Sequence, residues 1–271
     1  MNRILIVVAA AFILVAPSAI LAQETQVASS ASDAIASSAC SKVYTYGSGA
    51  TQFNWCPSLD GNLMMLAGPG GTSGPWEHIR NAVLLEGYAI CATGLAPTYD
   101  AGYKEANLLA SSIIYDYTTS FKVQRSTADA KFYITHYFTR NPVERSVTVT
   151  VYIKNTSGLI QYDVKYSRYV DYDIDFTTGD DIFDKSADGV WARNADSPYH
   201  AATLTGVTWA VAHNSYVESF NALDAVTYST CSPATAATPT VVSDWTARVT
   251  YNIGTLKPNY SKSFKFVYRI Q

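Results

Sequence analysis

Short runs of alternating apolar and polar residues dominate the chain from residue 107 to its end. Alternation with a period of two places every second side chain on the same face of an extended strand. Ser146–Ile153 (SVTVTVYI) shows this plainly, with three valines and an isoleucine on one side and only hydroxyl-bearing residues on the other. Helical periodicity is nearly absent. The sequence therefore predicts an all-β fold whose strands each bury one face.

Seven further runs alternate in the same way and are bounded by turn-forming residues. A large antiparallel β-sandwich of two sheets, or a supersandwich of the same kind, accommodates this many strands in one unit. The twenty tyrosines suit such a fold, because a tyrosine ring packs on a sheet while its hydroxyl stays in water. The other predicted strands are Ser112–Tyr117, Phe121–Arg125, Lys131–Phe138, Ile160–Tyr169, Val207–Ala212, Thr246–Ile253 and Ser263–Ile270.

The composition changes along the chain and suggests its organisation. Residues 1–22 have one positive charge, an apolar run and small residues toward the end, which is typical of a signal peptide. Residues 23–39 are small and polar, so we expect a flexible linker. Residues 40–271 then form a single β-sandwich domain, in which 40–106 is less regular. No later stretch has the ~18 consecutive apolar residues of a membrane span. We expect a secreted protein, periplasmic or extracellular, without a transmembrane segment.

The charge balance bears on the partner. The chain has 19 basic and 22 acidic residues, a net charge of −3. Such a chain lacks the excess of lysine and arginine that nucleic-acid binding requires. We expect no nucleic-acid partner.

Four cysteines lie beyond the predicted leader. An even number in an exported protein favours disulfides, and without any CxxC pair a zinc ribbon has no support. Four cysteines allow three pairings. We expect Cys40–Cys56 as a local bridge and Cys91–Cys231 as a long-range one.

Two segments resemble a known group of domains. Val151–Val164 (VYIKNTSGLIQYDV) and Tyr251–Tyr268 (YNIGTLKPNYSKSFKFVY) are similar to a strand–turn–strand and a closing hairpin of bacterial secreted immunoglobulin-like and supersandwich β-domains. Asn259 stands where those relatives often have glycine, and asparagine also tolerates the left-handed turn conformation. The resemblance implies a β-sandwich. It leaves the function open, since such domains serve as spacers, binding modules and enzyme accessories.

The segment 171–188 (DYDIDFTTGDDIFDKSAD) holds seven of the 22 acidic residues. If a strand continues over Tyr169–Phe176, then Asp171, Asp173 and Asp175 share one face and repel one another. Solvent, basic side chains or a cation must then neutralise them.

A calcium site is one hypothesis for this run. Asp184, Ser186 and Asp188, followed by Gly189, fit the first half of a calcium loop, with Asp180 or Asp181 as a further oxygen ligand. Position 12 is Ala195, so an EF-hand is excluded. The alternative is a solvated acidic loop that protects a sheet edge. The predicted Ca²⁺ ligands are Asp180, Asp181, Asp184, Ser186 and Asp188.

Catalysis is an alternative use of the same aspartates. Asp171 and Asp173 would lie ~6–7 Å apart on one strand face, within the range that glycosidases use for their two acids. No feature marks either as a raised-pKa acid. Trp191, which follows the acidic run, is a candidate sugar-stacking residue. The histidines lack the paired spacing of metal ligands: His78, His136, His200 and His213.

The sequence thus favours an exported noncatalytic β-sandwich with a binding or structural role at the cell envelope or outside the cell. Its expected partner is a glycan or a cell-surface protein, with bound calcium as a stabilising ion. The alternatives are a carbohydrate-active enzyme that uses paired aspartates of 171–188, and a subunit of a surface assembly whose edge strands pair with neighbours.

Overall fold

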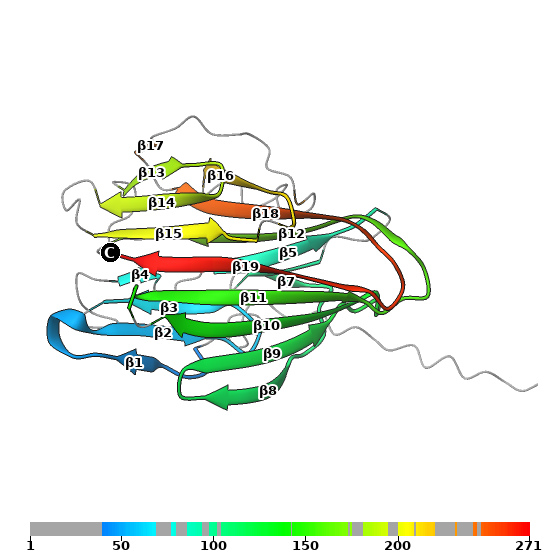
Figure 1. Ribbon diagram of the computed structural model, residues 1–271, viewed down its shortest axis with the longest axis horizontal. Coiled ribbons are helices and arrows are strands. Elements are labelled where there is room, and N and C mark those ends of the chain that lie inside the picture. The colour runs from blue at the N-terminus through cyan, green and yellow to red at the C-terminus, as the bar shows by residue number, and fades with distance from the viewer. Residues whose placement is uncertain are drawn as a thin grey trace, which may run out of the picture.

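The structure is a computed structural model. In the described part of the chain the elements are nineteen β-strands and a single short 3-10 helix, η1 (Gly49–Thr51), with no α-helix (Figure 1). The strands form three antiparallel sheets, which confirms the all-β sandwich prediction and adds a small third sheet. The described residues are 40–68, 77–79, 86–93, 98–101, 104–141, 143–172, 174, 181–194, 200–208, 210–219, 231, 241–242 and 245–271.

The largest sheet has nine strands in the order β17-β13-β14-β15-β19-β11-β10-β9-β8. The C-terminal strand β19 pairs with both β11 and β15 and so joins the two halves of this sheet. The strands are β8 (Ser112–Tyr117), β9 (Ser120–Ser126), β10 (Phe132–Asn141), β11 (Ser146–Asn155), β13 (Asp181–Lys185), β14 (Gly189–Asn194), β15 (Ala201–Gly206), β17 (Val241–Val242) and β19 (Ser261–Ile270).

The other two sheets are smaller. The six-stranded sheet has the order β16-β18-β12-β5-β6-β7 and the four-stranded sheet the order β1-β2-β3-β4. The six strands are β5 (Glu86–Cys91), β6 (Thr98–Ala101), β7 (Lys104–Ala106), β12 (Gln161–Asp171), β16 (His213–Ser219) and β18 (Trp245–Leu256). The four strands are β1 (Tyr44–Tyr46), β2 (Phe53–Pro57), β3 (Leu63–Ala67) and β4 (Glu77–Ile79).

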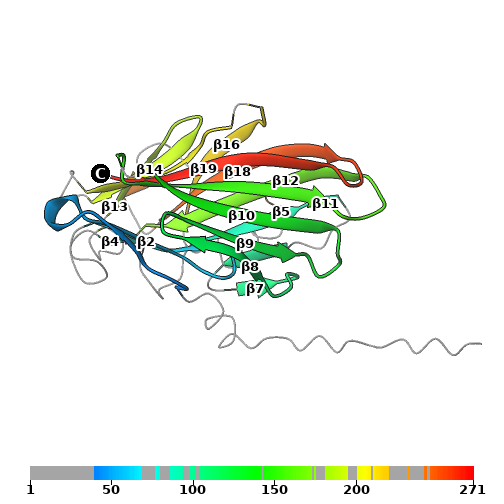
Figure 2. The same cartoon turned by 60° about the horizontal axis from the view of Figure 1, so that its bottom comes forward.

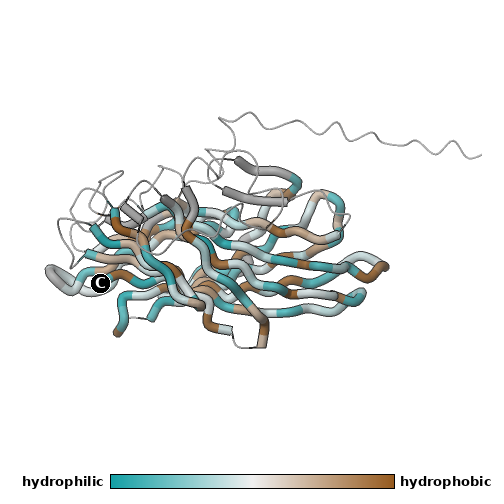
Figure 3. Tube along the Cα trace, turned by 90° about the horizontal axis from the view of Figure 1, so that it is seen from above, coloured by the Kyte–Doolittle hydropathy of each residue, from teal (hydrophilic) through white to brown (hydrophobic). Residues whose placement is uncertain are grey.

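Hydropathy alternates along the long strands, as the changing colour of the tube shows (Figure 3). On β11 the four apolar residues from Val147 to Ile153 are completely buried, whereas Tyr152 between them is 44% exposed. Burying such a side chain fully contributes about 1.5–3 kcal/mol. We call the face of the nine-stranded sheet that carries Val149 and Phe138 its inner face, and the opposite face, with Thr150 and Tyr137, its outer face.

Both smaller sheets pack on this inner face. Figure 1 and Figure 2 both show the blue N-terminal strands beside green β9 and β10. Trp55 of β2 stacks near Phe138 of β10, with ring centroids 6.5 Å apart, and the guanidinium of Arg140 lies 4.0 Å from the ring of Tyr46. Residues of all three sheets belong to one buried hydrophobic cluster. The less regular segment 40–106 therefore shares the core of the sandwich.

The expected disulfides are both present. Cys40 and Cys56 are joined with Cα atoms 5.7 Å apart, and Cys91 and Cys231 with Cα atoms 5.9 Å apart. The first bridge ties the start of the described chain to β2. The second connects the end of β5 to a residue 140 positions later.

The turn that contains Asn259 has the backbone that its sequence suggests. Asn259 has φ 62°, the left-handed conformation expected at the position where the resembling domains often have glycine. It lies in the turn that connects β18 to β19, and its backbone N–H donates to the carbonyl of Asn155 at 2.9 Å. Asparagine therefore serves in this turn without strain of the kind that a branched side chain would meet.

One predicted strand is wrong. Val207–Ala212 was expected to be extended, but the described residues of this segment form a turn, and the strands are β15 before it and β16 after it. Val211 N–H bonds back to the Thr208 carbonyl at 3.5 Å, and the Val211 side chain is buried from within the turn. The apolar alternation here belongs to a turn that buries Val211 and leaves Val207, Ala210 and Ala212 exposed.

The predicted leader 1–22 and linker 23–39 lie outside the described residues. Among the residues that are described, no helix is long and apolar enough to cross a membrane.

We expect loss of the long-range disulfide to cost more stability than loss of the local one. In the loop-entropy model, closing 140 residues contributes about 5 kcal/mol and closing 16 about 3 kcal/mol. Urea unfolding of C91S/C231S and C40S/C56S under oxidising conditions measures both losses. A larger loss in C40S/C56S would contradict the prediction.

Candidate functional site

The acidic run does not continue as a strand. β12 ends at Asp171, which is 6% exposed, and Tyr172 and Ile174 after it are both buried. The backbone N–H of Ile174 donates to Asp181 Oδ2 at 3.0 Å, which draws the chain toward β13 and out of the extended path. The predicted continuation of the strand over Tyr169–Phe176 is therefore wrong at residues 172 and 174, and the one-sided alignment of the three aspartates stays a prediction. Asp173 and Asp175 themselves lie outside the described residues.

The predicted metal ligands on β13 point to opposite faces of the nine-stranded sheet. Asp181 is buried on the inner side, whereas Asp184 is half-buried on the outer side, opposite Trp191 of β14. Asp184 Oδ1 accepts a hydrogen bond from the Lys185 backbone N–H at 2.7 Å. Asp180 lies outside the described residues.

Ser186 and Asp188 belong to the turn between β13 and β14. Ser186 Oγ accepts hydrogen bonds from the backbone N–H groups of Asp188 and Gly189, at 3.3 and 3.2 Å. Within the described part of the chain, no three His, Cys, Asp or Glu side chains are grouped to hold a metal ion. The Ca²⁺ site stays a prediction.

Asp188 lies in a surface pocket instead. The pocket has a volume of about 280 Å³ and lies at the end of β15, where β16 of the six-stranded sheet approaches. Asp188 Oδ1 is 3.3 Å from His213 Nε2; the aspartate side chain is 53% exposed and the histidine side chain 9%. The lining residues are Asp188, Thr205, Gly206, Val207 and His213.

Local contacts explain how the pocket forms. Gly206 N–H donates to the Asp188 carbonyl at 2.7 Å, which fixes the turn against β15. A Cβ on Gly206 would lie 2.7 Å from His213 Cδ2, so only glycine lets the histidine ring approach the strand. The ring packs on Tyr251, with centroids 4.8 Å apart. Burial raises the pKa of Tyr251, whose hydroxyl donates to the Lys265 carbonyl at 2.7 Å and accepts from Thr208 N–H at 3.0 Å.

The pocket thus combines a carboxylate, an imidazole and an apolar side chain. Asp188 offers carboxylate oxygens that accept hydrogen bonds, His213 offers an imidazole nitrogen, and Val207 is 37% exposed. A ligand with neighbouring hydroxyls and an apolar face matches such a lining. The carboxylate–imidazole pair is also the type of pair that transfers protons in acid–base catalysis.

Sequence reasoning named Asp188 as a calcium ligand and did not connect it with His213. The two residues are 25 positions apart and belong to different sheets, so no spacing rule joins them. The one available signal was Gly206, which stands directly after an alternating run at the end of a strand.

Trp191, the predicted sugar-stacking residue, lies half-exposed on the outer face of the nine-stranded sheet. Its strand neighbours in register are Asp184 and Thr203. Its position is open to a ligand but lies outside the residues that line the pocket.

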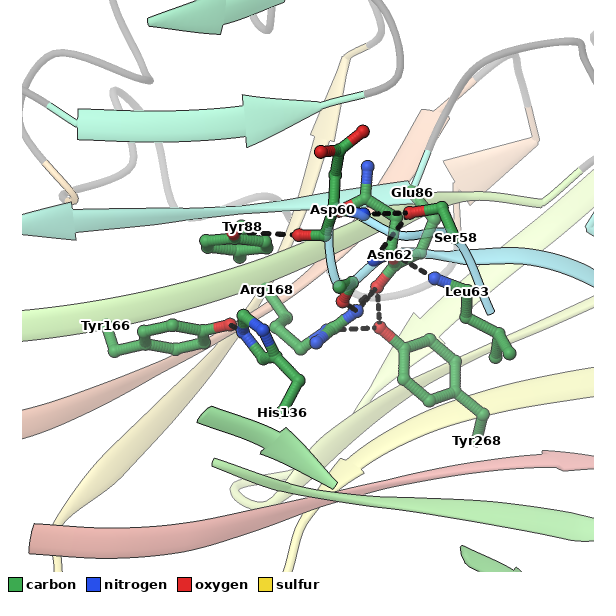
Figure 4. Close-up of polar contacts among 11 residues, drawn as sticks. Ser58, Asp60, Asn62, Leu63, Glu86, Tyr88, His136, Tyr166, Arg168 and Tyr268 are labelled. Carbon is green, nitrogen blue, oxygen red and sulfur yellow. Dashed lines mark hydrogen bonds and ion pairs between the residues drawn. The ribbon is translucent and has the colours of Figure 1, made fainter. Parts of the chain in front are cut away.

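A second polar cluster is buried where the three sheets meet (Figure 4). Arg168 of β12 donates to Glu86 Oε1 from Nε and Nη2, at 2.8 and 2.5 Å. The Tyr268 hydroxyl also donates to Oε1, while Leu63 N–H donates to Oε2 at 2.7 Å. Burial raises the pKa of Glu86 while the positive charge of Arg168 opposes that rise, and the carboxylate holds the pKa of Arg168 well above its ordinary value.

The turn between β2 and β3 fills the space beside this ion pair. The Gly61 carbonyl accepts a hydrogen bond from Arg168 Nη2 at 3.1 Å. The neighbouring Asp60 carbonyl accepts one from the Tyr88 hydroxyl at 2.9 Å. A Cβ on Gly61 would lie 2.3 Å from His136 Nδ1, and its φ of 91° also requires glycine. Glu86 and Arg168 have completely buried side chains, and the hydrogen bonds of Glu86 to Tyr268 and Leu63 connect all three sheets.

His136 is buried in the same region. Its Nε2 is hydrogen-bonded to the Tyr166 hydroxyl at 2.7 Å. Burial, with the charges of Arg168 and Arg125 added, lowers the pKa of His136 well below its ordinary value. The imidazole is therefore neutral in the folded protein at physiological pH.

Comparison with known proteins finds solved structures that share the fold of this chain. No family model and no curated protein sequence matches the chain. A bacterial glucoamylase, whose structure contains acarbose, matches over 86% of this chain and 32% of its own, with 10% identity and a TM-score of 0.61. A candidate aldose 1-epimerase from Escherichia coli K12 matches over 85% of this chain and 99% of its own, with 9% identity and a TM-score of 0.53. The chain thus spans about a third of the glucoamylase's length. At such identities the likeness shows a shared fold.

We expect the E86Q substitution to lower the free energy of unfolding by about 3–5 kcal/mol, because it leaves the buried guanidinium of Arg168 without a counter-charge. Urea unfolding measures the loss. The matched control is E144Q, whose partner Arg269 lies 2.6 Å away at the surface, and which should cost less than about 1 kcal/mol. Equal losses in the two variants would contradict the structural role of Glu86.

We expect stability to fall with acidification through His136. The unfolded imidazole takes up a proton near its ordinary pKa of 6.5, whereas the folded one does so only well below it. The unfolded state therefore binds more protons below pH 6.5, and stability, full above that pH, is lost at up to about 1.4 kcal/mol per pH unit as pH falls.

The H136Q variant isolates this effect, because glutamine retains a partner for the Tyr166 hydroxyl and does not titrate. Urea unfolding of both proteins across about pH 5 to pH 7.5 should give a shallower pH slope for H136Q below the ordinary histidine pKa. Parallel curves would show that another group causes the acid sensitivity.

Proposed function

We propose that the protein is a carbohydrate-binding β-sandwich and that the Asp188–His213 pocket receives a sugar residue. The observation that carries this proposal is the exposed carboxylate 3.3 Å from an imidazole, at a pocket large enough for one small ring. Sugars present paired hydroxyls that bind to such groups and apolar C–H faces that pack on residues such as Val207.

The fold neighbours support this reading. The glucoamylase carries the name of a carbohydrate enzyme and holds acarbose, and the Escherichia coli protein is named for a reaction of aldoses. A shared fold does not by itself transmit an activity, so the proposal depends on the residues of the pocket.

The same pair of residues supports a second candidate function, catalysis of sugar anomer exchange. Such a reaction needs one group that takes the proton from the anomeric hydroxyl and another that gives a proton to the ring oxygen, and a carboxylate and an imidazole can fill these roles. Hydrolysis by paired acids is less well supported, because the described residues that line the pocket include one carboxylate, that of Asp188.

We also propose that the protein works in an oxidising compartment outside the cytoplasm. Its support is that both disulfides are formed and that none of the described cysteines is free.

Binding of neutral sugars tests the pocket. We expect calorimetric titration with a panel of mono- and oligosaccharides, including glucose, galactose and maltotriose, to identify a ligand, and D188N and H213Q each to weaken its binding about 10- to 100-fold. This range corresponds to one lost hydrogen bond to a charged or polar partner. E144Q, which removes a surface carboxylate away from the pocket, should bind as the parent protein does.

Two outcomes decide between the candidates. Polarimetry measures whether the protein accelerates anomer exchange of glucose or galactose. An acceleration that D188N abolishes would support catalysis of anomer exchange as the function. Sugar binding that is unchanged in both pocket variants would remove the pocket from the proposed function.

A further inference from the structure

The outer face of the nine-stranded sheet carries a set of tyrosines and lysines across five strands, β8 to β11 and β19. The strand register places them in one row, because each residue is directly paired with the next on the neighbouring strand. Adjacent strands lie ~4.8 Å apart, so a row over five strands extends ~19 Å. The row is Tyr115, Lys122, Tyr137, Thr150 and Lys265.

The tyrosines form a continuous aromatic surface. The Tyr115 ring lies 4.9 Å from that of Tyr117 and, edge to face, 5.6 Å from that of Tyr137. Lys122 Nζ lies 5.3 Å from the Tyr115 ring. Tyr117 is 62% and Tyr152 44% exposed. Burial and a hydrogen bond with Tyr137 raise the pKa of Tyr115 to about 12, so this hydroxyl stays neutral at physiological pH.

Smaller hydroxyl side chains lie beneath these large ones. Thr135 and Thr150 belong to the same outer face but are only 6% and 8% exposed. Beside them Gln124 Nε2 donates to Thr135 Oγ1 at 3.0 Å, and its amide oxygen accepts from the Tyr133 hydroxyl. The face is therefore a broad surface of rings, amides and hydroxyls that can bind a polar chain along its length.

The charge of this face differs from that of the whole chain. The five strands contain one acidic residue, Asp116, and it points to the inner side, where it binds Lys42 and Tyr44 of the small sheet. The outer positions carry Lys122, Lys154 and Lys265, while the chain as a whole has more acidic than basic residues, 22 against 19. A ligand that complements this surface carries negative charge.

We propose that the outer face of β8–β11 and β19 binds an anionic polysaccharide, whose sugar rings stack on the tyrosines and whose acidic groups pair with the lysines. This inference deepens the proposed carbohydrate function and rests on it for the chemical class of the chain. Stacking on the tyrosines holds the ring faces, and lysine side chains supply the opposite charge.

The position of the pocket favours a carbohydrate over another acidic polymer. The row ends at Lys265, and the Lys265 carbonyl accepts the Val207 N–H at 3.2 Å, so the last strand of the row is hydrogen-bonded to a residue that lines the pocket. The proposed path of one polysaccharide runs across the tyrosines toward the strand that borders the Asp188–His213 pocket. Single-stranded nucleic acid also stacks on aromatic rings beside lysines and serves as the competing ligand in the test.

The experiment measures binding of polygalacturonate, neutral dextran and oligo-dT to the whole protein by affinity electrophoresis and biolayer interferometry. We expect polygalacturonate to bind more tightly than either other polymer. Binding should weaken at least 10-fold in Y117A/Y152A, two well exposed residues whose loss spares the core, and in Y115A/Y137A. K122Q/K265Q should lower both the affinity and its dependence on salt, as expected for lost ionic contacts.

The matched controls remove the same side-chain types from the other large sheet. Tyr162 is 53% exposed on β12, and Lys165 belongs to the same strand, so Y162A and K165Q should bind polygalacturonate as the parent does. Unchanged melting temperatures in Y117A/Y152A would establish that its loss of binding is not a loss of folding. Tighter binding of oligo-dT than of polygalacturonate, or equal binding by Y117A/Y152A and Y162A, would overturn the inference.

The pocket variants separate this inference from the proposed function. If D188N loses small-sugar binding while keeping most polygalacturonate affinity, both stand. If the panel of small sugars fails to bind but the tyrosine variants still weaken polygalacturonate binding, the pocket proposal fails and the outer-face inference stands. If small sugars bind at the pocket and polygalacturonate does not bind at all, the outer-face inference alone fails.

Discussion

Glu86 and Arg168 form the contact on which the arrangement of the three sheets depends. Both residues belong to the six-stranded sheet, but Glu86 also binds Tyr268 of the nine-stranded sheet and the backbone of Leu63 in the small sheet. Removing two charges from water is expensive, and an ion pair of this kind does not by itself stabilise a fold. Its effect is on specificity. A shift of any one sheet would leave a buried charge without its partners, so alternative packings of the same strands are strongly disfavoured.

The buried polar cluster around Glu86 and Arg168 limits where a ligand can bind. The turn that contains Gly61 lies next to the ion pair, and His136 beside it is hydrogen-bonded to Tyr166. Glu86, Arg168 and His136 are therefore completely buried, and each has a protein partner. Polar contacts with a ligand have to come from the strand ends, where Asp188 is exposed, and from the outer face of the large sheet.

The sequence predicts what depends on local pattern. Seven of the nineteen described strands, β8 to β12, β18 and β19, were predicted from period-two alternation, and the presence of disulfides from the even number of cysteines. The strand predicted over Val207–Ala212 was wrong because a turn can show the same alternating sequence pattern as a strand. Nothing local marks Glu86, whose partner Tyr268 is 182 residues away, or His213, whose partner is on another sheet. Net charge was also a poor guide to surface charge, because it averages over both faces of every strand.

In β8 the alternation of side chains places the acidic residue Asp116 on the inner face and the tyrosines on the outer face. Ser112 pairs with Gln124 and Ile113 with Val123, but the next outer pair is Tyr115 with Lys122, so one extra residue is accommodated in a β-bulge. Strict alternation without this bulge would turn Tyr115 and Tyr117 inward and place Asp116 among the lysines. The bulge instead directs Asp116 to Lys42 and Tyr44 of the small sheet and leaves the tyrosines outside.

A single inserted residue thus joins the small sheet to the large one and produces, on the opposite face, an aromatic surface free of acidic groups. Because one register serves both purposes, packing of the N-terminal sheet and the chemistry of the outer face are constrained together.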